Sequence, residues 1–272
     1  NCCLISGLIN YINKLNKENE QDVFNNENIV QTSAFKTMRH IGFNMMLIQY
    51  TDGETVYNLK RCSIKNKGKF NSLVNQWWFN KSKHIINNHY VWNDGKFMVV
   101  KKTRPFRFIF EVHGFLANTL NTKLFDMYTS GEIKIADTDD DKKIYSKLDT
   151  PMINIVDKIS NKGVSVEDVL KNSELSNKTI NNIINICHKL YNLAYSMKDK
   201  LGLTLACSQY EFGLDSDNNI ILIDDIHSYN NCVYWVNQDL PYDEKDPSIY
   251  NMNVIYNWLI SHCSDIEKDI PC

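Results

Sequence analysis

The chain has 272 residues, of which 43% are hydrophobic and 23% charged, and its formal net charge at pH 7 is −2. This balance excludes a disordered tail, a collagen-like fibre and a strongly basic nucleic-acid coat protein. No apolar run approaches the ~20 residues that a membrane span needs. We therefore expect a soluble chain that folds as one large domain or as two sub-domains sharing a cleft.

The eight cysteines form no CxxC pair and have no histidine at zinc-ligand spacing. We interpret them as free thiols in a reducing compartment, because a chain of this length does not need disulfides to fold; a disulfide framework is the alternative. The first nine residues lack the basic start and the cleavage site of a signal peptide. These features predict a cytoplasmic protein.

The first half of the chain predicts hairpins and one helix. The run 45–50 predicts a strand that ends at a turn over 51–53, and 55–57 restarts the β pattern. A second hairpin is predicted from 90–92 and 97–102 around the turn 93–96. Between them, apolar residues at helical spacing predict a helix that ends near residue 87. Its expected apolar face consists of Phe70, Leu73, Val74, Trp77 and Ile85 with Lys81, and the cluster Trp77-Trp78-Phe79 is expected to be core rather than a ligand cage.

The second half predicts a strand over 107–112, followed by a long surface loop over 129–162. An Asp-rich run at 137–141 could hold Ca²⁺ but lacks the ligand spacing of an EF-hand. Ser165 begins a capping box, and Ser176 begins a long amphipathic helix that Gly202 closes. Two strands, 203–211 and 220–225, flank a turn at 215–219, and a final helix is predicted over 248–262.

Two carboxylates in the last predicted hairpin suggest a cation site. Glu211 ends one strand and Asp225 ends its neighbour, so the two side chains can lie close together, where each disfavours ionisation of the other. Oxygen ligands of this kind, completed by phosphate oxygens and water, hold Mg²⁺-nucleotide in phosphoryl-transfer sites. An ordinary hairpin with exposed acids is the alternative.

The order of motifs resembles the SAICAR synthetase family. In that family a strand ending in E-F-G and a strand ending in D-E supply the metal carboxylates, followed by S-P-D and R-x-W. Here Glu211-Phe212-Gly213 matches the first motif, Asp225 the aspartate, Ser228 the serine and Trp235 the tryptophan.

Further landmarks follow in the same order from about residue 32 to residue 259. They are Lys36-Thr37 for the phosphate-covering hairpin, Thr51-Asp52, Ser63-Ile64, Lys67-Gly68, Trp78-Phe79, the strand from Phe108 to Phe115, Thr150-Pro151 and Asn257-Trp258-Leu259.

The resemblance implies an α+β fold with antiparallel sheets, similar to ATP-grasp proteins, in which two lobes enclose a nucleotide cleft. It implies an N-terminal β-rich lobe over 1–104 with the phosphate-covering hairpin, and a C-terminal lobe over 105–272 with the metal carboxylates. The activity it implies is that of an ATP-dependent carbon–nitrogen ligase of purine biosynthesis, which joins aspartate to a carboxylated aminoimidazole ribotide through an acyl phosphate.

The same resemblance implies the ligands and their residues. Glu211 and Asp225 would hold Mg²⁺ as catalytic residues and, with Lys36 and Lys101, would bind ATP. The partners would be small nucleotide and amino-acid substrates, with no nucleic acid and no membrane, and a homo-oligomer is compatible with the family. The substrate-binding residues it implies are His113, Thr119, Gln209, Ser228 and Asn230.

Several of these substrate-side positions depart from the family pattern. Gln209 stands for a lysine, Cys207 for an aspartate, His113 for an arginine, Asn118-Thr119 for G-S and Asn230 for an aspartate, while Val233, Met252 and Tyr256 replace cations. Ser33 and Ala34 stand for a glycine and a lysine of the phosphate hairpin. Because anionic ligands are normally held by Arg or Lys, we expect the family's acceptor to bind poorly.

Three functions therefore stay open at the level of sequence. The first is a ligase of the family type, with altered substrates. The second is a binding protein that kept the fold and lost the chemistry. The third is a phosphotransferase with the same Mg²⁺-ATP site, for which His227 is a candidate base, or else a histidine packed under the hairpin turn.

Overall fold

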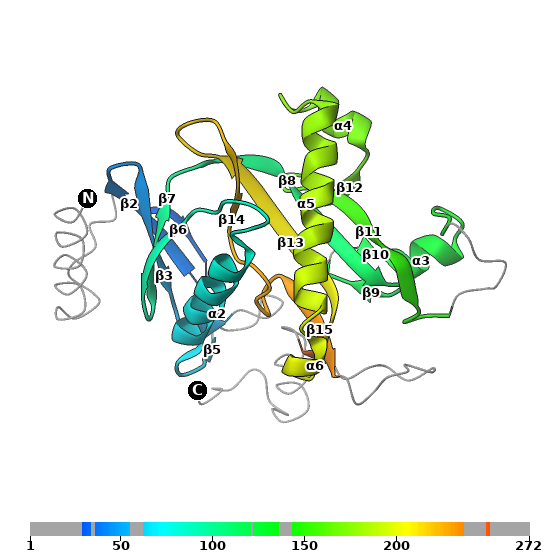
Figure 1. Ribbon diagram of the computed structural model, residues 1–272, viewed down its shortest axis with the longest axis horizontal. Helices are drawn as coiled ribbons and strands as arrows, with labels where there is room; N and C mark the ends of the chain where they lie inside the picture. The colour runs from blue at the N-terminus through cyan, green and yellow to red at the C-terminus, as the bar shows by residue number, and fades with distance from the viewer. Residues whose placement is uncertain are drawn as a thin grey trace. The chain divides into compact units, whose positions relative to one another are not determined.

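The computed structural model describes residues 29–33, 36–54, 62–120, 122–135, 143–236 and 249–250. The chain divides into two compact units, whose elements are shown in Figure 1. The first is built mainly from Asn1–Leu73 and Tyr90–Lys102, and the second from Val74–His89 and Thr103–Pro271. The predicted lobe boundary between residues 104 and 105 stays a prediction. No helix in the described ranges is both long and apolar enough to cross a membrane.

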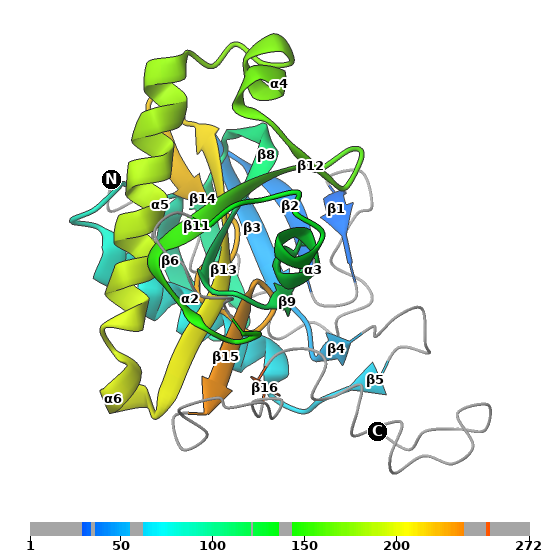
Figure 2. The same cartoon turned by 90° about the vertical axis from the view of Figure 1, so that its right-hand side faces the viewer.

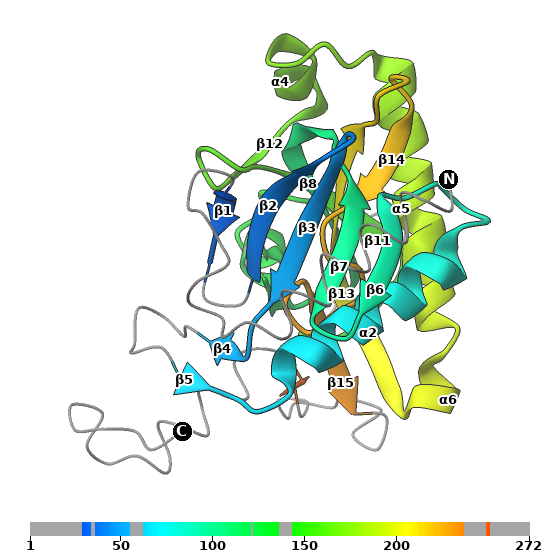
Figure 3. The ribbon, with the colours of Figure 1, turned by 90° about the vertical axis from the view of Figure 1, so that its left-hand side faces the viewer.

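The first unit contains a five-stranded antiparallel sheet in the order β1-β2-β3-β7-β6 (Figure 3). Its strands are β1 (Ile29–Thr32), β2 (Lys36–Gly42), β3 (Met45–Tyr50), β6 (Tyr90–Asp94) and β7 (Phe97–Lys101), and a separate pair is β4 (Gly53–Glu54) with β5 (Cys62–Ser63). The predicted strand 45–50 and the predicted second hairpin are confirmed. Gly95 has φ +61, a conformation that glycine adopts at little cost, so the short turn between β6 and β7 can close. Leu47, Phe97 and Val99 pack together as a core on this sheet.

The predicted helix is present as α2 (Lys67–Ser82), but its predicted buried face is wrong. Phe70 is 61% exposed, Leu73 44% and Trp77 45%. The fully buried positions are instead polar, namely Asn71, Ser72, Asn75 and Ser82, together with the buried Trp78 and Phe79. The core prediction therefore holds for Trp78 and Phe79 and fails for Trp77.

Hydrogen bonds to the chain explain why the polar face of α2 can be buried. In the first unit the Asn93 side chain donates to the Ser72 carbonyl at 3.0 Å and to its hydroxyl at 2.7 Å. In the second unit Asn75 Oδ1 accepts from the Ile226 amide at 2.7 Å. A buried polar group that gains such partners costs little, and apolar periodicity alone therefore identified the wrong face.

The second unit contains a seven-stranded sheet in the order β12-β11-β8-β13-β15-β16, with β14 also paired to β13. The strands are β8 (Arg104–Phe115), β11 (Lys147–Asp157), β12 (Lys162–Val164), β13 (Leu203–Leu214), β14 (Ile220–Ile223), β15 (Cys232–Val236) and β16 (Ile249–Tyr250). A small hairpin of β9 (Asn118–Thr119) and β10 (Thr122–Lys123) precedes α3 (Leu124–Thr129). These strands pair with one another antiparallel, and strands are confirmed near 107–112, 203–211 and 220–223. The predicted strand ends are wrong, because β13 continues past Glu211 to Leu214 and β14 ends at Ile223, before Asp225.

The loop predicted over 129–162 is wrong for its second part, because β11 forms an internal strand of the large sheet. Pro151 cannot donate a ladder hydrogen bond, and the pairing of β11 with β8 is irregular between Lys147 and Met152, where this proline falls. The acidic and basic residues around the strand hid its apolar positions, of which Ile155 and Val156 are buried.

The long helix α5 (Asn177–Tyr195) crosses β8 and β13 on one face of the large sheet (Figure 1). Tyr191 donates a hydrogen bond to the Leu205 carbonyl at 2.6 Å. Its ring lies against Gly114, where a Cβ would come within 1.8 Å of the tyrosine oxygen. The β9–β10 hairpin and α3 lie on the side away from α5 (Figure 2). The second face of the sheet is thus the one that the hairpin covers.

The helix starts are set by the predicted capping residues. Ser165 caps α4 (Val166–Lys171) in a full capping box with Asp168, and Ser176 accepts from the Thr179 amide at the start of α5. The long helix α5 ends at Tyr195, before the predicted Gly202. Gly202 adopts φ +65 and ends the short helix α6 (Lys198–Leu201) instead.

The end of the chain differs from its prediction in one respect. Ile249 and Tyr250 form β16 against β15, so the predicted final helix does not begin at residue 248. The other predictions at 34, 55–57, 137–141 and 251–262, including Met252, Tyr256 and the 257–259 match, lie outside the described residues.

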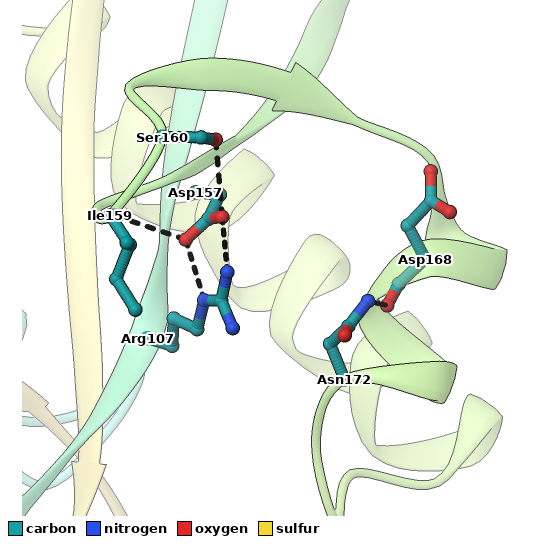
Figure 4. A network of polar contacts seen from close by, with 6 residues as sticks. All are labelled: Arg107, Asp157, Ile159, Ser160, Asp168 and Asn172. Atoms are coloured by element: carbon teal, nitrogen blue, oxygen red, sulfur yellow. Dashed lines mark hydrogen bonds and ion pairs between the residues drawn. The ribbon is translucent and has the colours of Figure 1, made fainter.

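A bidentate ion pair joins β8 to the end of β11 (Figure 4). Arg107 donates to the two carboxylate oxygens of Asp157 at 2.7 and 2.5 Å, and Asp157 also accepts from the Ile159 amide and the Ser160 hydroxyl. The Arg107 hydrogen bonds hold the pKa of Asp157 well below its ordinary value. This pair fixes the turn that leads from β11 into β12.

The pair makes stability depend on pH. Because the pKa of Asp157 is lower in the folded chain, its stabilisation is complete above the unfolded carboxyl pKa of about 3.9 and is lost as the pH falls through the folded value. We expect Asp157→Asn to lower the free energy of unfolding at neutral pH, and its difference from the wild type to shrink below about pH 4. Urea unfolding followed by circular dichroism measures this difference.

The matched control is Glu174→Gln, because Glu174 makes an exposed ion pair with Arg104 at 3.5 Å. Exposed pairs contribute little, so this variant should match the wild type at both pH values. An Asp157→Asn deficit that does not vary with pH would contradict the role given to the pair.

Gly114 provides a test of the contact between α5 and the sheet. We expect Gly114→Ala to destabilise the fold by about 1–3 kcal/mol, because the added methyl overlaps the Tyr191 ring. Gly163→Ala is the control, since its Cβ would meet only the end of the Asn154 side chain at 3.2 Å. Equal unfolding free energies for the two variants would show that α5 does not pack as described.

Candidate functional site: two polar clusters on the large sheet

Strand register places the polar residues of the large sheet in rows on the face away from α5. Glu111 of β8 lies between Asn154 of β11 and Gln209 of β13. In the next row His113 lies between Met152 and Cys207. Residues two apart on a strand share a face, so Glu111 and His113 point to the same side. Gly114, which contacts α5, lies on the other.

Glu111 is the centre of the first group, which we name the Glu111 cluster and which comprises Glu111, His113, Thr119, Thr122, Asn154 and Gln209. Its carboxylate is fully buried. The Gln209 amide donates to Oε1 at 2.7 Å, the Thr122 hydroxyl donates to Oε2, and His113 Nε2 lies 3.5 Å from Oε2. Burial raises the pKa of Glu111, but the contacts from His113, Thr122 and Gln209 outweigh it, so the pKa lies below its ordinary value. The carboxylate is therefore ionised at neutral pH.

Both nitrogens of the His113 ring have a polar neighbour. Nδ1 lies 3.2 Å from the Thr119 hydroxyl, and Nε2 lies on the side of Glu111. The Cys207 sulfur lies 3.8 Å from Nε2, yet burial and the charge of Glu111 raise the pKa of this thiol well above its ordinary value. A thiol that stays protonated is not a nucleophile, so this Cys–His–Glu arrangement is structural.

Three of the predicted substrate-binding residues thus come together. His113, Thr119 and Gln209 all belong to the Glu111 cluster. Sequence reasoning missed Glu111, Thr122 and Asn154, which donates to the Thr122 oxygen at 2.7 Å. The available signal was the alternation of Glu111 and His113 with apolar neighbours on one strand.

The second group, which we name the Asp225 loop, comprises Asp225, Ser228, Asn230 and Asn231 after β14. Asp224 adopts φ +61, which turns the chain out of the strand just before Asp225. Asn231 holds the loop closed by donating to the Asp225 carbonyl at 2.5 Å and accepting from the Ser228 amide at 3.0 Å.

Within this loop an oxygen atom is left without a partner. Asn230 Nδ2 lies 3.4 Å from the Asp225 carboxylate, while Asn230 Oδ1 is buried and makes no hydrogen bond. The atom of Asn230 that faces the carboxylate is its nitrogen, and its oxygen is a donor of the kind that a hard cation such as Mg²⁺ prefers.

Glu211 lies on β13 directly opposite Ile223, two residues before Asp225. Its carboxylate is part-exposed and pairs with the Lys158 ammonium at 2.5 Å. No cluster of three or more His, Cys, Asp or Glu ligands occurs in the described ranges. The Mg²⁺ roles of Glu211 and Asp225 stay predictions.

His227 follows Asp225 but takes no part in this arrangement. The ring is buried against Trp78 at 4.5 Å between centroids, and Nε2 lies 2.6 Å from the Tyr210 hydroxyl. Burial lowers the pKa of His227 to about 3. The His227 ring is thus a packing group, which was the alternative to its role as a catalytic base.

The two lysines assigned to ATP lie in the first unit. Lys36 is buried at the start of β2, where Ser33 accepts from its amide at 3.2 Å, and Lys101 is exposed at the end of β7. The roles of both lysines stay predictions.

The cysteines in the described ranges are buried thiols. Cys187, Cys207 and Cys232 are free and buried, and burial raises the pKa of each thiol. The free-thiol interpretation is confirmed for these three residues.

Comparison with known proteins gives consistent matches. The chain matches the SAICAR synthetase family over residues 34–271. Phosphoribosylaminoimidazole-succinocarboxamide synthase of Legionella pneumophila (strain Paris) is 22% identical over 237 residues, which are 84% of this chain and 75% of that protein. The chloroplastic enzyme of Arabidopsis thaliana is 24% identical over 81% of this chain and 56% of its own length.

Solved structures match at the level of the fold. A SAICAR synthase has a TM-score of 0.72 at 16% identity, covering 86% of this chain and 84% of its own. A SAICAR synthetase in complex with ADP has a TM-score of 0.66 at 19% identity, covering 80% and 86%. The predicted α+β fold with antiparallel sheets is confirmed. Since the family match spans most of the sequence, this chain belongs to the SAICAR synthetase family, whose members are ATP-dependent carbon–nitrogen ligases.

Proposed function

We propose that this chain is an ATP-dependent ligase that joins an amine to a carboxylate, and that its acceptor differs from the carboxylated ribotide of its relatives. The observation that carries the proposal is the Asp225 loop, in which the Asn230 nitrogen lies 3.4 Å from the Asp225 carboxylate and the buried Asn230 oxygen has no hydrogen-bond partner. The relative named phosphoribosylaminoimidazole-succinocarboxamide synthase and the SAICAR synthetase solved in complex with ADP support ATP as the energy source.

In this proposal the chain's own side chains have distinct tasks. Asp225, Asn230 and Glu211 would hold Mg²⁺, which when bound compensates negative charge on the nucleotide phosphates. Lys36 and Lys101 would contribute positive charge for binding nucleotide phosphates. Ser228 and Asn231 keep the Asp225 loop in shape through their mutual hydrogen bonds, so that the Asp225 carboxylate is pre-positioned.

Lys158 adds a condition to the use of Glu211. Its ammonium already neutralises the carboxylate, so a divalent ion would have to displace the lysine or share the carboxylate with it. This contact, and the burial of His113 and Thr119, favour a second candidate function: a protein that binds nucleotide without ligase turnover. The phosphotransferase alternative has less support, because the buried His227 is engaged by Tyr210 and is a weak base.

ADP release decides between ligase and binding protein. Purified chain with Mg²⁺-ATP, aspartate and a panel of carboxylates that includes the carboxylated ribotide should release ADP only when an accepted pair is present. We expect Asp225→Asn to reduce this rate by about 100-fold or more, since a charge that acts on the transferring phosphoryl group is lost. Glu174→Gln is the matched control and should keep the full rate. A rate that Asp225→Asn leaves unchanged would remove the proposed site.

Nucleotide binding is tested separately by thermal unfolding. A ligand that binds only the folded chain raises the melting temperature, by an amount equivalent to about 2.7 kcal/mol at a hundredfold excess over Kd. We expect Mg²⁺-ATP to stabilise the wild type, and Lys158→Gln to bind the metal complex more tightly because Glu211 is released. Stabilisation without ADP release from any pair would select the binding protein, whereas no stabilisation would contradict both candidates.

A further inference from the structure

The donors assigned to the acceptor side already face an internal anion. His113, Gln209 and Thr122 all point to the carboxylate of Glu111, and His113 uses its other nitrogen on Thr119. Side chains that would grip a phosphate or carboxylate of a substrate are thereby engaged within the protein.

Charge makes this arrangement selective. Glu111 is fully buried and carries its charge where no water screens it. A second anion placed among the same donors would face that charge at short range and would find the donors already used. A neutral or cationic group would meet neither penalty.

We propose that Glu111 determines substrate specificity by acting as a built-in replacement for the anionic group of the substrate, so that the substrate of this chain is neutral or cationic at this end. The inference rests on the proposed function for its choice of the acceptor side. It assigns a role to a residue that lies outside the carboxylates proposed to hold metal.

Removing the internal anion should create a site for an external one. In Glu111→Ala the donors from His113, Thr122 and Gln209 lose their acceptor, which destabilises the fold because they stay buried. Acetate, a methyl group bonded to a carboxylate, matches the Cγ and the carboxylate that this substitution removes. Inorganic phosphate represents the substrate-like anion. Both ions can therefore satisfy the same donors.

The experiment measures anion binding without any nucleotide. Melting temperature and the ring nitrogen signals of His113, assigned by His113→Gln, are followed as acetate or phosphate is added, with chloride as the salt control. We expect Glu111→Ala to be stabilised by both anions, with a shifted His113 signal and an affinity at least about tenfold higher than that of the wild type. Glu174→Gln changes the net charge equally and should behave as the wild type.

Two results would overturn the proposal. One is a wild-type His113 signal that phosphate shifts with the same affinity as in the variant, because the donors would then be available despite Glu111. The other is a folded Glu111→Ala protein that responds to neither anion. Should Glu111→Ala not fold in any salt, Glu111→Ser, which vacates the same carboxylate position, replaces it. A phosphate-dependent shift confined to Glu111→Ser sustains the proposal, and an equal shift in the wild type or no shift in Glu111→Ser overturns it. Because no ATP is present, these outcomes are independent of the ADP-release assay.

Discussion

A charged carboxylate at the centre of a sheet must be surrounded by donors, and Glu111 imposes this requirement on the second unit. Its neighbours on both adjacent strands are amides, Asn154 and Gln209, and the β9–β10 hairpin brings Thr122 to the same atoms. Without these contacts the desolvation of the charge would drive the carboxyl to its neutral form. The hairpin, the register of three strands and the position of the His113 ring therefore depend on one another.

The fold could be predicted wherever local chemistry decides it. Ser165, Ser176 and Gly202 determine helix ends through their own hydrogen bonds or dihedral angles, and these were identified from the sequence. The buried polar face of α2 and the strand β11 were not identified from the sequence, because both depend on partners that are distant along the chain. Asn75 is buried because Ile226, far along the chain, needs an acceptor, and β11 is a strand because β8 pairs with it despite Pro151.

The candidate site was predictable in its residue types and not in its contacts. The resemblance indicated five substrate-binding residues, of which His113, Thr119 and Gln209 come together in one cluster. The other two, Ser228 and Asn230, lie in the Asp225 loop. The resemblance did not indicate Glu111 or Lys158. A sequence shows the spacing of residues along one strand, but it does not show which residue of the neighbouring strand lies opposite. These two missed charges matter most for the chemistry of the predicted residues. Glu111 is the anion that His113 faces, and Lys158 is the counter-charge of Glu211.

Two side chains of β13 that lie two residues apart have partners of opposite charge. Gln209 is bound to the anion Glu111, and Glu211 is bound to the cation Lys158. Each charge thus has its own nearby partner, and nearby partners dominate over distant ones inside a protein. In the proposed function, a different residue at position 209 would therefore leave the contact between Lys158 and Glu211 in place. A member of the family can thus change side chains on the proposed acceptor side while it keeps the carboxylates of Glu211 and Asp225.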